Sequence, residues 1–210
     1  MTPSRAFRRA LLVLLALLAC AVPLAASPGL TPPQQVVEAV SEGLRQVLRE
    51  DRDLLDKDPQ YVYRLVDELL VPNVDVVRVS ALVLGPVWRE ATPSQRDAFA
   101  EQFKRMLVRT YATAVNELSE WQIQYLPIRM EPDQDKVLVR TRIMRAGGDP
   151  VSVDYRMARR GERWLAYDVS IDGVSLLVNY RSNFVRLARE KGIDGLIQDL
   201  AQHNAERAGS

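Results

Sequence analysis

The chain has 210 residues, of which 47% are hydrophobic and 26% charged, and its formal net charge at pH 7 is +1. This near-neutral balance argues against binding to nucleic acid or lasting capture by anionic headgroups, which both require a clear excess of cationic side chains. The sequence holds one histidine and one cysteine, so a zinc site is not expected.

The N-terminus has the order of a secretory signal peptide. Three arginines precede an apolar run at 11–18, and small residues follow at Ala25 and Ala26. The run is too short to span a membrane. We therefore expect residues 1–26 to be removed on export to the periplasm, which leaves one domain over 27–210. Removal of the three arginines changes the net charge to −2.

The only cysteine lies within the predicted signal peptide. Leu17-Leu18-Ala19-Cys20 resembles a lipoprotein box, in which Cys20 would become the acylated first residue. Leu18 fits the middle of such a box poorly, so we favour a free N-terminus over a lipid anchor. An exported domain without cysteine has no disulfide and needs a large enough core.

Helices are predicted over residues 31–118. Thr31-Pro32-Pro33-Gln34 and Thr92-Pro93-Ser94-Gln95 each place threonine at a cap, proline in the first turn and glutamine three residues after the threonine. The expected helices lie near 32–51, 59–71, 74–84 and 93–118, with a short helical turn at 86–91.

Strands are predicted over residues 121–172. The expected strands are 121–130, 136–145, 151–158 and 163–171, and glycine-containing turns join the last three into an antiparallel meander. One face is predicted to be apolar and the other to carry Arg140, Arg142, Asp154, Arg156 and Asp168.

The segment from Leu165 onward changes its period. Leu165, Tyr167, Val169 and Ile171 alternate as on a strand, and we expect them to share one face. From Val174 the apolar spacing becomes helical, at Leu177, Tyr180, Phe184 and Leu187. Asp172-Gly173 is interpreted as a sharp turn from strand to helix, followed by helices over 174–202.

An apolar sheet face needs a helical cover. We expect the helices at 93–118 and 174–190 to supply it. The predicted fold is therefore α+β, a cone formed by a twisted four-stranded antiparallel sheet under several helices.

Four segments resemble the MlaC family, also called toluene-tolerance proteins. They are residues 167–184, residues 99–111, Val153-Asp154-Tyr155-Arg156, and residues 192–197, and the resemblance covers about 31–200. These proteins are periplasmic phospholipid shuttles of Gram-negative bacteria. The resemblance implies an NTF2-like cone with an internal apolar cavity that holds phospholipid as cargo and needs no cofactor.

The resemblance also implies partners. MlaC-like proteins shuttle between an outer-membrane lipoprotein–porin complex and an inner-membrane ABC transporter with an MCE-domain subunit, a system that maintains outer-membrane lipid asymmetry. We expect a monomer that follows this pattern and binds no nucleic acid.

The residues alone fit a filled core as well as a hollow one, and the resemblance favours the cavity. A solid core would instead indicate a periplasmic interaction or chaperone-like module. The candidate lining residues are Phe103, Met106, Tyr111, Val139, Thr141, Val153, Tyr155, Tyr167, Val169, Leu177 and Tyr180. Arg109 and Arg181 are candidates for a headgroup phosphate, with a structural ion pair as the alternative reading of each.

The sequence offers no convincing catalytic or metal-binding group. His203 lies near the C-terminus, and Gly173-Val174-Ser175-Leu176-Leu177 departs from a nucleophile elbow at Leu177, so Ser175 is interpreted as a helix-start residue. A small-molecule enzyme in a cone would need Asp154 or Asp168 inside the cavity. Strand alternation places both aspartates on the polar face, so we expect no enzymatic activity.

Overall fold

The computed structural model describes residues 29–51, 54, 58–116, 121–144 and 148–206. The chain divides into two units, Met1–Leu30 and Thr31–Ser210, and every helix and strand named below belongs to the second. The predicted signal peptide, Cys20 included, lies outside the described residues. None of the described helices is both long enough and apolar enough to cross a membrane.

Helices occupy most of the first half of this unit, as predicted. In order they are α2 (Pro32–Glu50), α4 (Pro59–Leu65), the π-helix η1 (Val66–Leu70), the 3₁₀ helix η2 (Val71–Asn73), α5 (Val76–Leu84), α6 (Val87–Glu90) and α7 (Pro93–Asn116). At the start of α2, Gln34 Oε1 accepts hydrogen bonds from the Thr31 N–H and hydroxyl at 3.0 and 2.9 Å. At the start of α7, Thr92 and Gln95 bond reciprocally through backbone and side chain. The two predicted capping sequences therefore do start helices.

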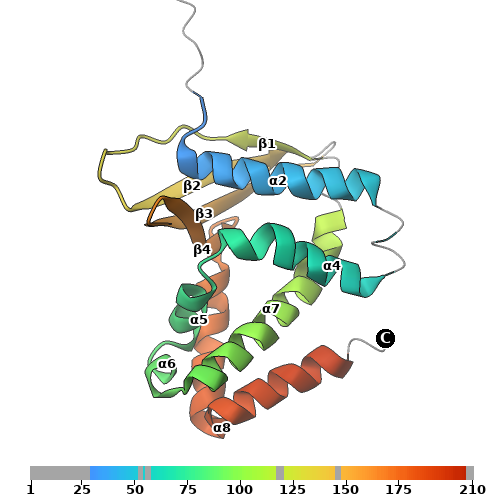
Figure 1. Cartoon of the computed structure of the whole chain (residues 1–210), viewed down its shortest axis with the longest axis vertical. Helices are drawn as coiled ribbons and strands as arrows, with labels where there is room; N and C mark the ends of the chain where they lie inside the picture. Colours follow the sequence, from blue (N-terminus) through green and yellow to red (C-terminus); the bar gives the residue numbers. More distant parts are fainter. Residues whose placement is uncertain (1–28, 52–53, 55–57, 117–120, 145–147, 207–210) are drawn as a thin grey trace, which may run out of the picture. The chain divides into compact units, whose positions relative to one another are not determined.

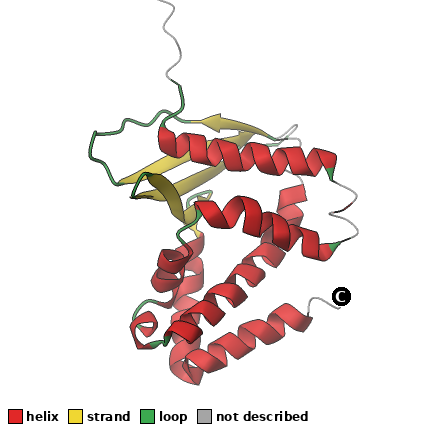
Figure 2. Ribbon diagram, viewed as in Figure 1, coloured by secondary structure: helices red, strands yellow, loops and turns green. Residues whose placement is uncertain are grey.

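The sheet has five antiparallel strands in the order β1-β2-β3-β4-β5. Figure 2 shows its strands in yellow beside the helices in red. They are β1 (Gln122–Tyr125), β2 (Lys136–Met144), β3 (Val151–Arg160), β4 (Arg163–Ile171) and β5 (Val174–Ser175). The prediction of four strands missed the short β5. Asp172 and Gly173 both have positive φ, 47° and 81°, and form a two-residue hairpin loop in place of the predicted strand-to-helix turn.

A β-bulge divides β4 into two registers. Val169 pairs with Tyr155 and Asp168 with Arg156, but the next pair is Ala166 with Met157, so Tyr167 is the extra residue. The prediction that Leu165 and Tyr167 share a face with Val169 is therefore wrong. Before the bulge, Trp164 and Ala166 instead pack with the buried residues of the sheet.

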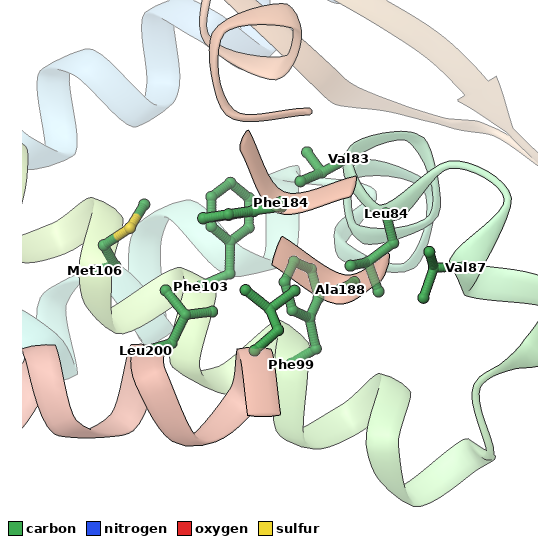
Figure 3. Packing of buried hydrophobic residues seen from close by; sticks show 10 residues of the cluster. Val83, Leu84, Val87, Phe99, Phe103, Met106, Phe184, Ala188 and Leu200 are labelled. Carbon is green, nitrogen blue, oxygen red and sulfur yellow. The ribbon is translucent and has the colours of Figure 1, made fainter. Parts of the chain in front are cut away.

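The sheet packs on α2, and the later helices have a core of their own. Val36 and Val37 of α2 pack with Val137, Val139 and Met157 of the sheet, and α2 lies along the sheet in Figure 1. α7, α5 and α8 (Leu176–Glu206) pack together around a separate cluster (Figure 3). The prediction that the 93–118 and 174–190 helices cover the apolar sheet face is corrected accordingly, since their aromatic side chains contact one another.

Asp168 connects the sheet to the start of α8. Its buried carboxylate accepts hydrogen bonds from the Ser175 hydroxyl at 2.8 Å and from the Leu177 N–H at 3.2 Å. The Ser175 hydroxyl in turn accepts from the Val178 N–H, so Ser175 is a helix-start residue as predicted. Arg156 lies 3.5 Å from the same carboxylate, so these two residues, both predicted on the polar face, form an ion pair.

We expect Asp168→Ala to lower the free energy of unfolding by about 2 kcal/mol, because it leaves the half-buried donors at the start of α8 without their charged acceptor. Arg156→Ala is the matched control and should cost less than about 1 kcal/mol, because its side chain is largely exposed. Urea unfolding followed by circular dichroism measures both values. Equal losses in the two variants would contradict this role of Asp168.

Candidate functional site

Two apolar cavities lie within the Thr31–Ser210 unit. The first has a volume of about 240 Å³ and is lined by residues of α2, α4, η1, η2, α5 and α7. The second has a volume of about 200 Å³ and lies between α2 and the sheet. Leu44, Leu70 and Val74 line both cavities, so the two are neighbouring compartments separated by these three side chains.

The cavity walls are mostly valine and leucine. The first cavity has three polar lining residues, Ser80, Lys104 and Tyr111. Lys104 is held by carboxylates of two elements, Asp67 at 2.7 Å and Glu101 at 2.8 Å. Together the compartments fall within the roughly 300–1,000 Å³ typical of ligand sites. Walls of this kind suit a flexible hydrocarbon chain, which needs no directional contacts.

Four of the predicted lining residues lie at the cavities. Phe103 and Tyr111 line the first cavity, and Tyr155 and Val169 line the second. The two residues of the first cavity belong to α7, and the two residues of the second cavity belong to the sheet.

The other seven lie outside the lining of either cavity. Met106, Leu177 and Tyr180 pack in or against the helical core, and Val139 lies in the core between sheet and α2. The buried Thr141 hydroxyl donates to the Val153 carbonyl at 2.8 Å. The remaining residue is Tyr167, whose ring centroid lies 3.7 Å from Arg78 Cζ as a result of the bulge.

The two predicted headgroup arginines also lie away from the cavity walls. Arg109 is half-buried on α7. Arg181 is exposed on α8 and extends over Gly85, where a Cβ atom would lie 3.4 Å from its Nη2. Neither residue lines the first or second cavity.

Residues of α2 and η1 also form the cavity walls, and none of them was among the predicted lining residues. Val37, Val40 and Leu44 have the spacing of one apolar helix face. The sequence indicates this face but not the element that lies opposite it. The π-helix η1 contributes Val66 and Leu70. Such turns often occur at functional sites but leave no clear pattern in a sequence.

Burial changes the acidity of two cavity tyrosines. Burial, together with a side-chain hydrogen bond to Tyr180, raises the pKa of Tyr111 to about 12. Burial also raises the pKa of Tyr155 to about 12, with the nearby Tyr125 acting in the same direction. Both cavity hydroxyls are therefore neutral at any physiological pH.

We expect these two tyrosines to ionise near pH 12 in the folded protein, against an ordinary value of 10.0. The unfolded chain releases the same protons near pH 10, so the free energy of unfolding should fall as the pH rises between these values. Ultraviolet absorbance of tyrosinate measures the ionisation, and Tyr155→Phe should remove part of the pH dependence. Ionisation of all seven tyrosines together near pH 10 would contradict the expectation.

The aspartates and the histidine that the sequence offered as candidates for chemistry lie away from the cavities. They contain no group of three or more His, Cys, Asp and Glu side chains placed to hold a metal ion. Asp168 bonds to the start of α8, and Asp154 pairs in register with Arg140. Neither aspartate lines either cavity, and His203 is exposed on α8.

The fold and site define an α+β protein with an internal apolar ligand site, and comparison with known proteins identifies its family. The sequence matches the family profile described as "MlaC protein" over residues 38–202. This chain belongs to the MlaC family, so both the predicted resemblance and the predicted α+β fold are confirmed.

Three relatives illustrate the match. Intermembrane phospholipid transport system binding protein MlaC of Haemophilus influenzae is 26% identical over 175 residues, 82% of each chain. Toluene tolerance protein ttg2D of Pseudomonas putida is 28% identical over 188 residues, 89% of this chain and 85% of the relative. The solved structure of the phospholipid-binding protein from Ralstonia solanacearum in complex with a phospholipid superposes with a TM-score of 0.79. The two sequences are 32% identical, and the match covers 85% of this chain and 99% of the Ralstonia solanacearum chain.

Proposed function

We propose that this protein binds phospholipid by its acyl chains and carries it between membranes. The observation that carries the proposal is the pair of adjoining apolar cavities, which share Leu44, Leu70 and Val74. Two compartments separated by a few aliphatic side chains offer separate room for the tails of one lipid. The named activity of the Haemophilus influenzae relative and the lipid in the Ralstonia solanacearum structure support the same function.

The energetics of apolar burial favour a carrier over an enzyme. Each buried CH₂ group contributes roughly 0.8 kcal/mol, so a tail of ordinary length gains about 10 kcal/mol before the cost of ordering it. A lipid held this strongly leaves for water very slowly. Transfer therefore requires direct docking to a membrane machine that offers the tails another apolar environment.

The finer proposal follows the family. The exported protein acts as a periplasmic monomer after removal of its signal peptide. It receives and delivers lipid at an outer-membrane lipoprotein–porin complex and at an inner-membrane ABC transporter with an MCE-domain subunit, and so maintains outer-membrane asymmetry. It carries the phospholipid unchanged, without a cofactor and without catalysing a reaction.

We expect native mass spectrometry of the protein purified from a bacterial host to show a complex heavier than the polypeptide by one or more phospholipids. Organic extraction and lipid analysis of the same sample identify the cargo. A denatured sample serves as control and should give the polypeptide mass alone. A polypeptide mass without lipid under gentle conditions would refute the proposed function.

We expect Val76→Trp to reduce bound lipid, because Val76 lines the first cavity and the larger ring fills space needed by a tail. Loss of room for about three CH₂ groups at roughly 0.8 kcal/mol each weakens binding by about 2 kcal/mol, or some 30-fold. The neighbouring Val77 is 67% exposed, so Val77→Trp is the matched control and should leave the lipid load unchanged. Native mass spectrometry compares the two variants, and equal lipid loads would show that the first cavity holds no tail.

A further inference from the structure

A polar depression between α2 and β1 adjoins the second cavity. It has a volume of about 440 Å³ and is lined by charged residues of α2 and by the start of β1. Arg45, Trp121 and Ile123 line both this depression and the apolar cavity. The second cavity therefore meets the polar surface at these three residues.

Arg45 is unusually buried for a charged residue. Its side chain is 15% exposed, whereas the other arginines in described ion pairs are 54–58% exposed. Its guanidinium donates to the Glu42 carboxylate and, through Nη2, to the Trp121 carbonyl at 3.2 Å. Burial of a cation costs free energy unless anionic partners compensate for lost water. A cation held at the mouth of an apolar cavity is thus placed to receive an anionic group attached to an apolar chain.

We propose that Arg45 binds the phosphate of a phospholipid whose tail occupies the second cavity. This proposal rests on the proposed function and adds the position of the headgroup. The fork of donors on a guanidinium matches phosphate oxygens. Arg49 lies one turn further along α2 in the same depression and offers a second guanidinium. Glu38 and Glu42 also line the depression, so its charges balance and the phosphate is attracted by Arg45 itself. The Trp121 ring, which is apolar with a polar edge, suits the boundary between tail and headgroup.

The present partner of Arg45 can be exchanged for a phosphate. Glu42 is 59% exposed and lies on the same helix, so its carboxylate can turn into water at little cost. An oxygen of the lipid phosphate would then take the place of the Glu42 carboxylate oxygen at the Arg45 guanidinium.

Lys104, which lines the first cavity, is a weaker candidate for binding the headgroup phosphate. Lys104 is bound by both Asp67 and Glu101. Burial lowers the pKa of Lys104, but the hydrogen bonds that its ammonium donates to these two carboxylates outweigh burial and raise the pKa above its ordinary value. A lysine already neutralised by two carboxylates has little attraction left for a phosphate. The headgroup therefore belongs at Arg45, and not at the predicted Arg109 or Arg181.

Lipid binding by variants tests the assignment. Delipidated protein is titrated with phosphatidylethanolamine and with a diacylglycerol of identical tails, and binding is followed by displacement of a fluorescent fatty acid. We expect Arg45→Gln to weaken phosphatidylethanolamine binding about tenfold, the loss of one charge-assisted bond, and to leave diacylglycerol binding unchanged. Arg186→Gln is the control: Arg186 also pairs with a glutamate of its own helix but lines none of the three hollows described, so neither lipid should be affected.

A second variant makes the opposite prediction. Glu42→Gln removes the carboxylate that competes with the phosphate and should tighten phosphatidylethanolamine binding a few-fold without affecting diacylglycerol. This variant keeps Arg45, so it tests the proposal even if Arg45→Gln does not fold. Unchanged phosphatidylethanolamine affinity in Glu42→Gln would overturn the proposal.

The other outcomes separate this proposal from the proposed function. The headgroup assignment alone would be overturned if the wild-type protein binds lipid normally and Arg45→Gln binds it equally well. It would also be overturned if Arg45→Gln loses the same affinity for phosphatidylethanolamine and for diacylglycerol. Competition by millimolar glycerol 3-phosphate without tails would show that Arg45 binds a free phosphate and would also overturn it. Failure of the wild-type protein to bind either lipid would overturn the proposed function and this assignment together.

Discussion

Aromatic contact between α7 and α8 determines where the interior is filled and where it stays hollow. The rings of Phe99, Phe103, Tyr180 and Phe184 lie 5.5–5.8 Å apart in stacked and edge-to-face pairs. Because these large side chains satisfy one another, they do not reach across to the sheet. The space between the helical core and the sheet is left to smaller aliphatic side chains of α2, η1 and α5, which enclose it without filling it.

The sheet and the helical core are joined through the end of β4. The hairpin loop at Asp172-Gly173 returns the chain as β5, and Asp168 then fixes the first turn of α8. The bulge at Tyr167 rotates the earlier part of β4, so Tyr167 stacks with Arg78 of α5 while Val169 stays in the cavity wall. One strand thereby lines the cavity and also fixes the helix that completes the fold.

Local signals in the sequence predicted the elements, and the errors arose from tertiary packing. The Thr31 and Thr92 caps identified the starts of α2 and α7, and alternation correctly gave the buried face of β2. An alternating pattern does not reveal a bulge, so Tyr167 was assigned to the wrong face. Likewise, an apolar helix stripe does not say which neighbour covers it.

The candidate site was harder to predict than the fold for the same reason. Phe103 and Tyr111 line the first cavity and Tyr155 and Val169 the second, whereas equally apolar neighbours such as Val139 and Met106 pack in solid core. Wall residues and core residues have the same apolar spacing in the sequence. They differ only in whether another side chain or empty space lies opposite them. The wall residues of η1 depend on a π-turn that no local signal indicated.

A hollow interior has an energetic consequence for a lipid carrier. In the cavities of about 240 and 200 Å³ the wall side chains lack packing partners. A tail that occupies this space therefore adds dispersion contacts to the folded state. Apolar walls treat all tails alike, because dispersion and burial have no directional requirement. Discrimination between lipids must therefore arise where the apolar space meets charge, and in the second cavity that place is the boundary formed by Arg45 and Trp121.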